Sequence, residues 1–573
     1  MYRYFLIGKS NWDIKMKKLT GAAILAELFK SIGITHIFMV PAVLRRTMVE
    51  IEERTNIKRL HVHSEKSAAY MADGYARASG KPAICMAQVI GALNIAAGLR
   101  DAYLAHSPVI ALTGGRDPKT KLKKVYQEID DMPAFEPVTK LNATIDDVSR
   151  FPDMLKQAVR VATSGSPGPV HLQFKGNEGQ IDLEETEIND DFQPMNIRIP
   201  PHRPICDNSI LNRAIDSILS AKRPIIVAGG GARHSKCASE LLTFADHMNL
   251  PIATSLNGKD LICSTHPLSC GVVGTYSRES ANLSVKAADL IIFIGSETGS
   301  MTTNFWSLPN EKARVIQIDI EPENLGRNYS LEVAVQGDAK AILTEMNFIA
   351  STKPSPERKK WLAQITTLKN EWYKKYKSLM DSDANPIRPE RLCKEISDNA
   401  PDNALIVVDT GHAGMWMGGM FDLKHSEQSY IRSAGHLGWA FPASIGAKCA
   451  VPDRPVICFT GDAGFWYHIA EIEVAVRWNI NVIVIVNNNS GGNQSKRGFD
   501  RAYGGEQTSE GLQMWTFSNV NFAEIAKNIG AVGIRVENPK DIKPAIKNAL
   551  ELKKPVIIDV VTDIDALAPL AVN

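Results

Sequence analysis

The sequence predicts an α/β protein made of three doubly wound parallel-sheet domains. The chain has 573 residues, which is more than one hydrophobic core normally organises. Short apolar runs that end at Gly or Pro, such as residues 34–41 and 81–89, alternate with segments of helical spacing, such as residues 24–33. This alternation is typical of parallel strands joined by helical crossovers. Two stretches break it, the acidic and proline-rich residues 183–205 and the polar residues 352–390, and we expect both to be linkers.

The two expected linkers divide the chain into three blocks. The expected domains span residues 17–185, 203–350 and 375–573, each of an ordinary domain length. No short-period repeat is present, but three consecutive α/β blocks could share a related topology.

Composition and charge exclude several classes of function. The formal net charge is +2, so neither nucleic acid nor an anionic membrane is expected as the main partner. No apolar stretch reaches the length of a membrane span, and the apolar run within residues 1–18, YFLIG, is too short for a secretory signal. The eight cysteines are scattered without a CxxC pair, which indicates buried thiols in a reducing compartment. We therefore expect a cytoplasmic protein.

One strand–helix–strand unit carries a carboxylate and an amide at its two strand ends. Residues 456–460 and 482–486 are apolar and β-branched, and the segment between them, residues 465–478, has helical spacing. A right-handed crossover brings both strand ends to the same edge of the sheet, where α/β proteins bind ligands. Asp462 and Asn489 should therefore lie close together, although 27 positions separate them.

These residue types favour a magnesium ion. One carboxylate, one amide oxygen and one backbone carbonyl make a poor calcium site, but Mg²⁺ takes its remaining ligands from water and phosphates. A helix beginning near Gly464 would offer free N–H groups to a phosphate, and glycines at 464, 491 and 492 allow close approach of the backbone. The unit is thus expected to hold Mg²⁺ bridged to a diphosphate.

The same residues resemble the signature of thiamine diphosphate-dependent enzymes. The resemblance implies Asp462, Asn489 and the Gly491 carbonyl as metal ligands. It implies cofactor contacts from four positions: Gly461, Ala463, Gly464 and Gly491. Ala463 departs from the family, which most often has glycine there. The alternative is an ordinary strand–helix–strand unit with polar turns.

A second motif lies about 400 residues upstream. Residues 61–88, HVHSEKSAAYMADGYARASGKPAICMAQ, resemble the pyrimidine-domain motif of the same family, and Glu65 matches its catalytic glutamate. That carboxyl group hydrogen-bonds the aminopyrimidine ring and favours the imino form that removes the C2 proton. Alone, Glu65 would be no more than a capping charge in the first turn of a helix.

Further segments resemble the acetolactate synthase and 2-hydroxyacyl-CoA lyase branch, namely residues 100–115, 124–140, 165–174, 407–416 and 433–448. Gln127 matches a glutamine that faces the thiazolium ring. Gly435 would accept a hydrogen bond from the 4′-amino group, and Leu437 would be the wedge that bends the cofactor. Gly411 and His412 would lie beside the diphosphate.

Four histidines near these motifs could line the reacting centre: His61, His63, His412 and His436. A single histidine is more often structural, but at least one of four is expected to handle protons. We take His412 and His436, with Glu65 and Gln127, as the candidate catalytic residues.

Several positions depart from acetolactate synthase and leave the cofactor set and substrate open. Residues 41–43 and 88–91 replace its glycine-containing loops, and residues 299–302 stand where a flavin-binding stretch is expected. Residues 229–231 form a triple glycine after a strand, which alone is a weak nucleotide signal. Either FAD or ADP, or neither, could occupy the central domain.

The resemblance implies a 2-keto acid decarboxylase and carboligase. It would form a carbanion or enamine on thiamine diphosphate and pass it to a second carbonyl. A second reading, from Gly491, is a 2-hydroxyacyl-CoA lyase or oxalyl-CoA decarboxylase. A third is a catalytically silent binding subunit. In this family the cofactor lies between the pyrimidine domain of one chain and the diphosphate domain of the next, so a homodimer or homotetramer is expected.

Overall fold

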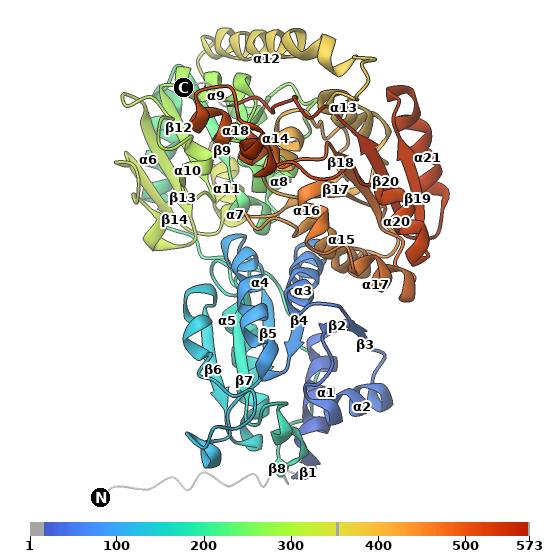
Figure 1. The fold of residues 1–573 in the computed structure, drawn as a ribbon. Helices are drawn as coiled ribbons and strands as arrows, with labels where there is room; N and C mark the ends of the chain where they lie inside the picture. Colours follow the sequence, from blue (N-terminus) through green and yellow to red (C-terminus); the bar gives the residue numbers. More distant parts are fainter. Residues whose placement is uncertain (1–15, 351–353, 571–573) are drawn as a thin grey trace, which may run out of the picture.

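The computed structural model describes residues 16–350 and 354–570. Figure 1 shows an N-terminal domain in blue and cyan below two upper domains, the central one in green and the C-terminal one in orange and red. Each contains a six-stranded sheet in which every pairing is parallel. The predicted fold class is confirmed. The N-terminal segment on which the absence of a secretory signal was inferred lies mostly outside the described residues.

The N-terminal sheet has the order β3-β2-β4-β5-β7-β6. Its strands are β2 His36–Met39, β3 Lys58–His61, β4 Ala83–Ala87, β5 Val109–Gly114, β6 Leu141–Ile145 and β7 Val170–Phe174. Its helices are α1 Gly21–Ile32, α2 Arg45–Arg54, α3 Glu65–Ser79, α4 Ala92–Leu104 and α5 Phe151–Thr163. A separate antiparallel pair, β1 Lys17–Thr20 with β8 Glu185–Ile188, closes the domain at the start of the first expected linker.

The central sheet has the order β11-β10-β9-β12-β13-β14. Its strands are β9 Pro224–Ala228, β10 Ile252–Thr254, β11 Ser269–Val272, β12 Leu290–Ile294, β13 Arg314–Asp319 and β14 Val333–Gln336. Its helices are α6 Asn208–Ser220, α7 Gly230–His234, α8 Ala238–Met248, α9 Glu279–Ala287, α10 Ser300–Thr303 and α11 Ala339–Ile349. The long helix α12, Arg358–Met380, lies within the second expected linker and crosses the top of the molecule in Figure 1.

The C-terminal sheet has the order β16-β15-β17-β18-β20-β19. Its strands are β15 Leu405–Val408, β16 Ser429–Arg432, β17 Val456–Gly461, β18 Ile483–Asn488, β19 Val532–Val536 and β20 Val556–Val561. Its helices are α13 Pro389–Asn399, α14 His412–Gly419, α15 Ala440–Ala450, α16 Asp462–Trp466, α17 Glu471–Arg477, α18 Asn493–Tyr503, α19 Ser509–Gln513, α20 Phe522–Ile529 and α21 Ile542–Glu551. The middle strands are continuous apolar runs because helices cover both faces.

The outer two sheets share one strand order, which differs from that of the central sheet. Their corresponding helices, α3 and α15, pack directly on each other where the N-terminal domain meets the C-terminal one (Figure 1). The contact is reciprocal: Gly74 abuts the backbone of Ala443, and Gly446 abuts the backbone of Met71. Small residues at this crossing let the two helices approach closely.

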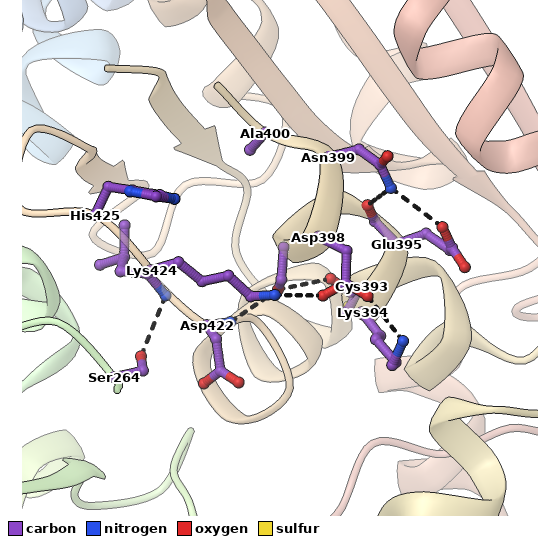
Figure 2. Close-up of polar contacts among 12 residues, drawn as sticks. Ser264, Cys393, Lys394, Glu395, Asp398, Asn399, Ala400, Asp422, Lys424 and His425 are labelled. Atoms are coloured by element: carbon purple, nitrogen blue, oxygen red, sulfur yellow. Dashed lines mark hydrogen bonds and ion pairs between the residues drawn. The ribbon is translucent and has the colours of Figure 1, made fainter. Parts of the chain in front are cut away.

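The segment after α14 is fixed on both sides. Figure 2 shows the side chain of Lys424 paired with Asp398 of α13. Nζ of Lys424 lies 2.6 Å from Oδ1 of Asp398. The backbone N–H of Leu423 donates to the hydroxyl of Ser264, in the central domain, at 3.1 Å. Asp422 donates its N–H to the hydroxyl of Ser397 at 2.9 Å. These contacts anchor the segment that follows α14, the helix whose first residue is the candidate His412.

The prediction of one continuous helix over residues 465–478 is wrong. The segment contains two helices, α16 and α17. The residues between them form tight turns in which a backbone N–H bonds the carbonyl of the third preceding residue, as the N–H of His468 does with the carbonyl of Phe465 at 3.3 Å. The first part begins at Asp462 rather than near Gly464. No helix within the described ranges is both long and apolar enough to cross a bilayer.

Candidate functional site

Asp462 and Asn489 meet at the carboxyl edge of the C-terminal sheet. The N–H of Gly491 donates to Oδ2 of Asp462 at 3.0 Å and to Oδ1 of Asn489 at 3.2 Å. The other oxygen of Asp462 accepts from the N–H of Ala463 at 2.8 Å. Strands β17 and β18 are parallel neighbours, so their ends place the two side chains together as the crossover predicts.

The carboxylate of Asp462 lies in a site that suits a cation. Burial raises the pKa of Asp462 to about 7, and the N–H groups of Ala463, Gly491 and Ser490 oppose this rise. A bound cation would offset the penalty of burying that charge. No group of three or more His, Cys, Asp or Glu side chains in the described chain forms a metal site. Besides this carboxylate, the amide oxygen of Asn489 is a further oxygen group at the same edge.

Three glycines beside this edge leave open space. A Cβ built on Gly435 or Gly461 meets no atom within 4 Å, and one on Gly411 meets only the Cβ of Gln494 at 4.0 Å. The chain's own packing therefore does not fill the space next to them. Gly464 differs, because a Cβ there would lie 3.0 Å from Oδ2 of Asp409. The open backbone fits a ligand that lies directly against the main chain.

His412 presents an unpartnered nitrogen inside the site. Its Nδ1 is 3.1 Å from Oε1 of Gln494, and its Nε2 is buried without a hydrogen-bond partner. Burial lowers the pKa of His412 to about 4, so the ring is neutral near pH 7. An orphaned buried nitrogen fits a group that is bound only in the complete site.

His436 is tied to the N-terminal domain. Its Nδ1 hydrogen-bonds the hydroxyl of Tyr70 in α3, and the two rings are T-shaped with centroids 5.5 Å apart. Burial lowers the pKa of His436. The half-buried Leu437 follows it, and Gly435, exposed and at φ +151°, precedes it. The three residues thus form the turn that leads into α15.

The other two candidate histidines lie before α3. Nε2 of His63 is 2.8 Å from Glu473 of α17, and its ring centroid is 6.3 Å from that of His61. Burial lowers the pKa of His61. Both side chains are exposed at the junction of the outer domains.

Glu65 and Gln127 lie in the N-terminal domain. Oε2 of Glu65 accepts from Nδ2 of Asn94 at 3.0 Å, and a Cβ on Gly91 would lie 2.6 Å from its Cγ. Gln127, at φ +64°, accepts from Nε2 of Gln88 at 3.0 Å. No hydrogen bond found in the described part of one protomer joins Glu65 or Gln127 to the C-terminal domain.

Three family models match the chain in order. They are the thiamine pyrophosphate enzyme N-terminal TPP binding domain over residues 19–134, the central domain over residues 211–346 and the C-terminal TPP binding domain over residues 409–560. The chain belongs to the thiamine pyrophosphate enzymes. This confirms the predicted family, whose cofactor is also called thiamine diphosphate, and that the chain is a thiamine diphosphate-dependent enzyme.

Curated relatives of this thiamine pyrophosphate enzyme resemble it over nearly their full length. A probable acetolactate synthase large subunit of Methanococcus aeolicus is 31% identical over 95% of this chain and 92% of its own. The same description applies to a Methanocaldococcus jannaschii protein, also 31% identical, with 95% and 92% covered. An acetolactate synthase large subunit of Haemophilus influenzae is 28% identical, with 96% and 95% covered. The chain is thus an acetolactate synthase-like member of the family.

Asp409 is a further residue of the candidate site that the sequence did not single out. Its carboxylate accepts from the N–H groups of Thr410, Gly438 and Ala440 at 2.8, 3.1 and 3.4 Å, and from the hydroxyl of Thr460 at 3.2 Å. It therefore joins the turn before α15 to β17. Burial raises the pKa of Asp409 to about 6. The signal was a lone carboxylate directly after the apolar run at 405–408.

A cavity of about 340 Å³ lies at the carboxyl edge of the central sheet. Residues 229–231, Glu297, Asp319 and Asp338 line it, with His106 contributed by the N-terminal domain. The triple glycine identified in the sequence therefore borders a real cavity. Its volume is at the lower end of the range of about 300–1,000 Å³ common for ligand sites.

Proposed function

We propose that this enzyme is a Mg²⁺- and thiamine diphosphate-dependent decarboxylase and carboligase for 2-keto acids, of the acetolactate synthase type. The observation that carries the proposal is the convergence of Asp462 and Asn489 on the N–H of Gly491, in a chain that also has Glu65 at the head of α3. The curated relatives described as acetolactate synthase large subunits support the same reaction class.

The proposed metal ligands are Asp462, Asn489 and the carbonyl of Gly491, with diphosphate oxygens and water completing the shell. The open backbone at Gly411, Gly461 and Gly435 leaves room for the cofactor, and we propose further contacts from Ala463 and Gly464. Bound thiamine diphosphate supplies a carbanion centre that attacks carbonyl groups and stabilises the product of decarboxylation.

The protein's own contribution at the other end of the site is a proton-handling group. We propose that Glu65 hydrogen-bonds the aminopyrimidine ring and that the carbonyl of Gly435 accepts from its amino group. Leu437 would set the bend of the cofactor, and Gln127 and His436 would face the substrate. The amide of Asn94 donates to Oε2 of Glu65 and so holds that carboxylate at the start of α3.

We propose that the complete site forms between two copies of the chain. Apolar side chains flank both halves of the site and face solvent in the protomer: Ile90 (56% exposed), Leu93 (44%), Trp466 (39%) and Tyr467 (58%). We propose that this exposed apolar surface is part of an interface between subunits. A second copy would bury it and bring the missing half of each site, giving a homodimer or, by further association, a homotetramer.

The substrate test compares two panels. Purified protein with Mg²⁺ and thiamine diphosphate is incubated with pyruvate and other 2-keto acids, and separately with formyl-CoA or oxalyl-CoA. We expect CO₂ release and a carboligation product from the keto acids. Reaction only with the CoA thioesters would replace this proposal by the acyl-CoA lyase alternative. Absence of thiamine diphosphate binding in calorimetry would favour the catalytically silent subunit.

We propose a nucleotide as the ligand of the central cavity. The triple glycine at 229–231 and the small volume favour ADP over the larger FAD. Mass spectrometry of molecules released from the purified protein decides between them.

All eight cysteines are free thiols, which supports the proposed cytoplasmic location.

A further inference from the structure

Two buried carboxylates, one in each outer domain, accept hydrogen bonds from the other outer domain. Asp101 belongs to α4 of the N-terminal domain and is 1% exposed. Glu471 is the first residue of α17 in the C-terminal domain and is also 1% exposed. Each has hydrogen-bond partners in the other domain.

Asp101 binds the turn that leads into α15. Its Oδ1 accepts from the N–H of Ala434 at 2.9 Å. Its Oδ2 accepts from the hydroxyl of Ser433 at 2.9 Å and from the N–H of His436 at 3.2 Å. The side of Gly435 that would carry a Cβ meets no atom within 4 Å, so these bonds, rather than packing around that residue, fix the path of the turn.

Asp101 also has an ionic partner inside its own domain. Nη2 of Arg77 is 2.8 Å from Oδ1 of Asp101, and the same guanidinium pairs with Asp73. Arg77 also donates to the carbonyl of Arg432, directly before the turn, at 2.6 Å. A paired, buried carboxylate remains an acceptor with fixed geometry.

Glu471 makes the reverse contact at the start of α3. Both of its oxygens accept from the N–H of His63, at 3.2 and 3.4 Å. His63 lies two residues before Glu65. The neighbouring His468 adds a bond between its Nδ1 and the hydroxyl of Ser67 at 2.8 Å. The C-terminal domain thus fixes the backbone from which Glu65 projects.

We propose that Asp101 and Glu471 are reciprocal positioning residues, by which each outer domain fixes the reacting segment of the other. Asp101 fixes residues 433–437, which would contact the cofactor, and Glu471 fixes the start of the helix that carries Glu65. This inference rests on the proposed function for the roles of those two segments. It goes beyond that function because it links the two half-sites that one chain carries, residues 433–437 and the start of α3.

The two substitutions Asp101→Asn and Glu471→Gln keep size and remove acceptor capacity. Asp101→Asn should weaken thiamine diphosphate binding about tenfold, because one oxygen becomes a donor facing an N–H group or the Ser433 hydroxyl. Glu471→Gln should leave that affinity within about twofold and lower kcat about tenfold, because it shifts the base and not the cofactor. A merely structural interface would give both variants the same profile.

A second readout does not depend on the cofactor. In the protein without added cofactor, hydrogen exchange at the amides of Ala434 and His436 should rise about tenfold in Asp101→Asn, and that at His63 in Glu471→Gln. The matched control is Asp182→Asn. Asp182 is similarly buried in the N-terminal domain, and it accepts from the N–H and the hydroxyl of Thr47, within that domain.

The outcomes separate the two proposals. Wild-type protein that binds no thiamine diphosphate would refute the proposed function, while the exchange data would still decide the positioning claim. Unchanged exchange at Ala434, His436 and His63, or a change equal to that of the Asp182 variant, would overturn the inference. If Asp101→Asn does not fold, Ser433→Ala removes one of its three bonds and should raise exchange at Ala434 and His436 by a smaller factor.

Discussion

At the scale of single residues, Glu65 carries the most direct prediction. Glu65→Gln keeps the size of the side chain but removes the ionisable group that the proposed reaction needs. We expect kcat to fall by about 10²–10⁴, as for loss of a general acid–base group. Thiamine diphosphate should still bind, because the proposed metal ligands are unchanged. Calorimetry and steady-state kinetics check this, and full activity would remove Glu65 from the mechanism.

Gly91 must stay small because of Glu65. A methyl group there would lie 2.6–2.7 Å from Cγ, Cδ and Oε1 of Glu65, which forces the carboxylate to move. We expect Gly91→Ala to lower kcat about 10²-fold, the effect of a shift near 1 Å in a reacting group.

The control for Gly91→Ala is Gly98→Ala. It puts a methyl group 2.6 Å from the Cβ of Ala69 at the same contact between α3 and α4. Gly98→Ala should lower the stability of the protein about as much as Gly91→Ala does, but it should not lower kcat about 10²-fold. Equal losses of kcat in the two variants would contradict the role given to Gly91.

Lys259 is a buried cation with a testable pH signature. Burial lowers its pKa from 10.5 to about 7, and its Nζ donates to the carbonyl of Gly418 at 2.9 Å. Because the folded-state pKa is depressed, its unfavourable contribution is fully present below pH 7 and fades as the pH rises toward 10.5.

Lys259→Met should therefore be more stable relative to wild type at pH 6 than at pH 10. The difference in free energy of unfolding between variant and wild type should change by on the order of 1–3 kcal/mol between the two pH values. The comparison between the two pH values cancels the lost bond to Gly418, which is absent at both. Denaturant midpoints at pH 6 and pH 10 measure it. A stability difference between variant and wild type that is the same at both pH values would contradict a lowered pKa for the buried Lys259.

The sequence located some site residues and not others for a physical reason. Asp462 and Asn489 were placed together because a crossover unit has only one geometry. Glu65 came from the resemblance, since a glutamate in a first helical turn carries no distinct signal. The partners Asp101 and Glu471 were not found, because each acts on a segment hundreds of positions away that only the packed domains bring near.

At the scale of elements, the crossing of α3 and α15 leaves no room for a side chain at its two glycines. A Cβ on Gly74 would lie 2.0 Å from the carbonyl oxygen of Ala443, and one on Gly446 1.8 Å from that of Met71. Gly74→Ala should therefore push the helices apart and lower stability by at least about 1–3 kcal/mol.

The control for Gly74→Ala is Gly498→Ala in α18. A Cβ there meets no atom within 4 Å, so alanine should stabilise the helix by about 0.5–1 kcal/mol. Thermal unfolding of the two variants provides the measurement. A Gly74 variant as stable as the wild type would show that the two helices do not pack so closely.

The interrupted helix at 465–478 shows why periodicity failed locally. Apolar spacing predicted one helix, yet the chain bends after α16 and turns His468 toward Ser67 and Tyr70 of α3. Contacts with another domain override the local pattern there. The flanking strands were predicted well, because both are buried on two faces and their apolar runs need no partner to be recognised.

At the scale of the whole molecule, the outer domains repeat one topology and pair through corresponding helices. The sequence showed three α/β blocks but could not show which two match, since strand order is absent from a hydrophobic pattern. The protomer joins both proposed half-sites in one chain, yet Glu65 has its hydrogen bond within its own domain. We therefore propose that a second chain completes each site.

Mixed dimers test this proposal most directly. Glu65→Gln and Asp462→Ala chains, each inactive alone, are co-expressed with different tags and the mixed dimers are purified. If Glu65 of one chain serves the magnesium site of the other, each mixed dimer has one intact site and about half of the wild-type activity per dimer. Mixed dimers as inactive as the two parents would contradict the shared site.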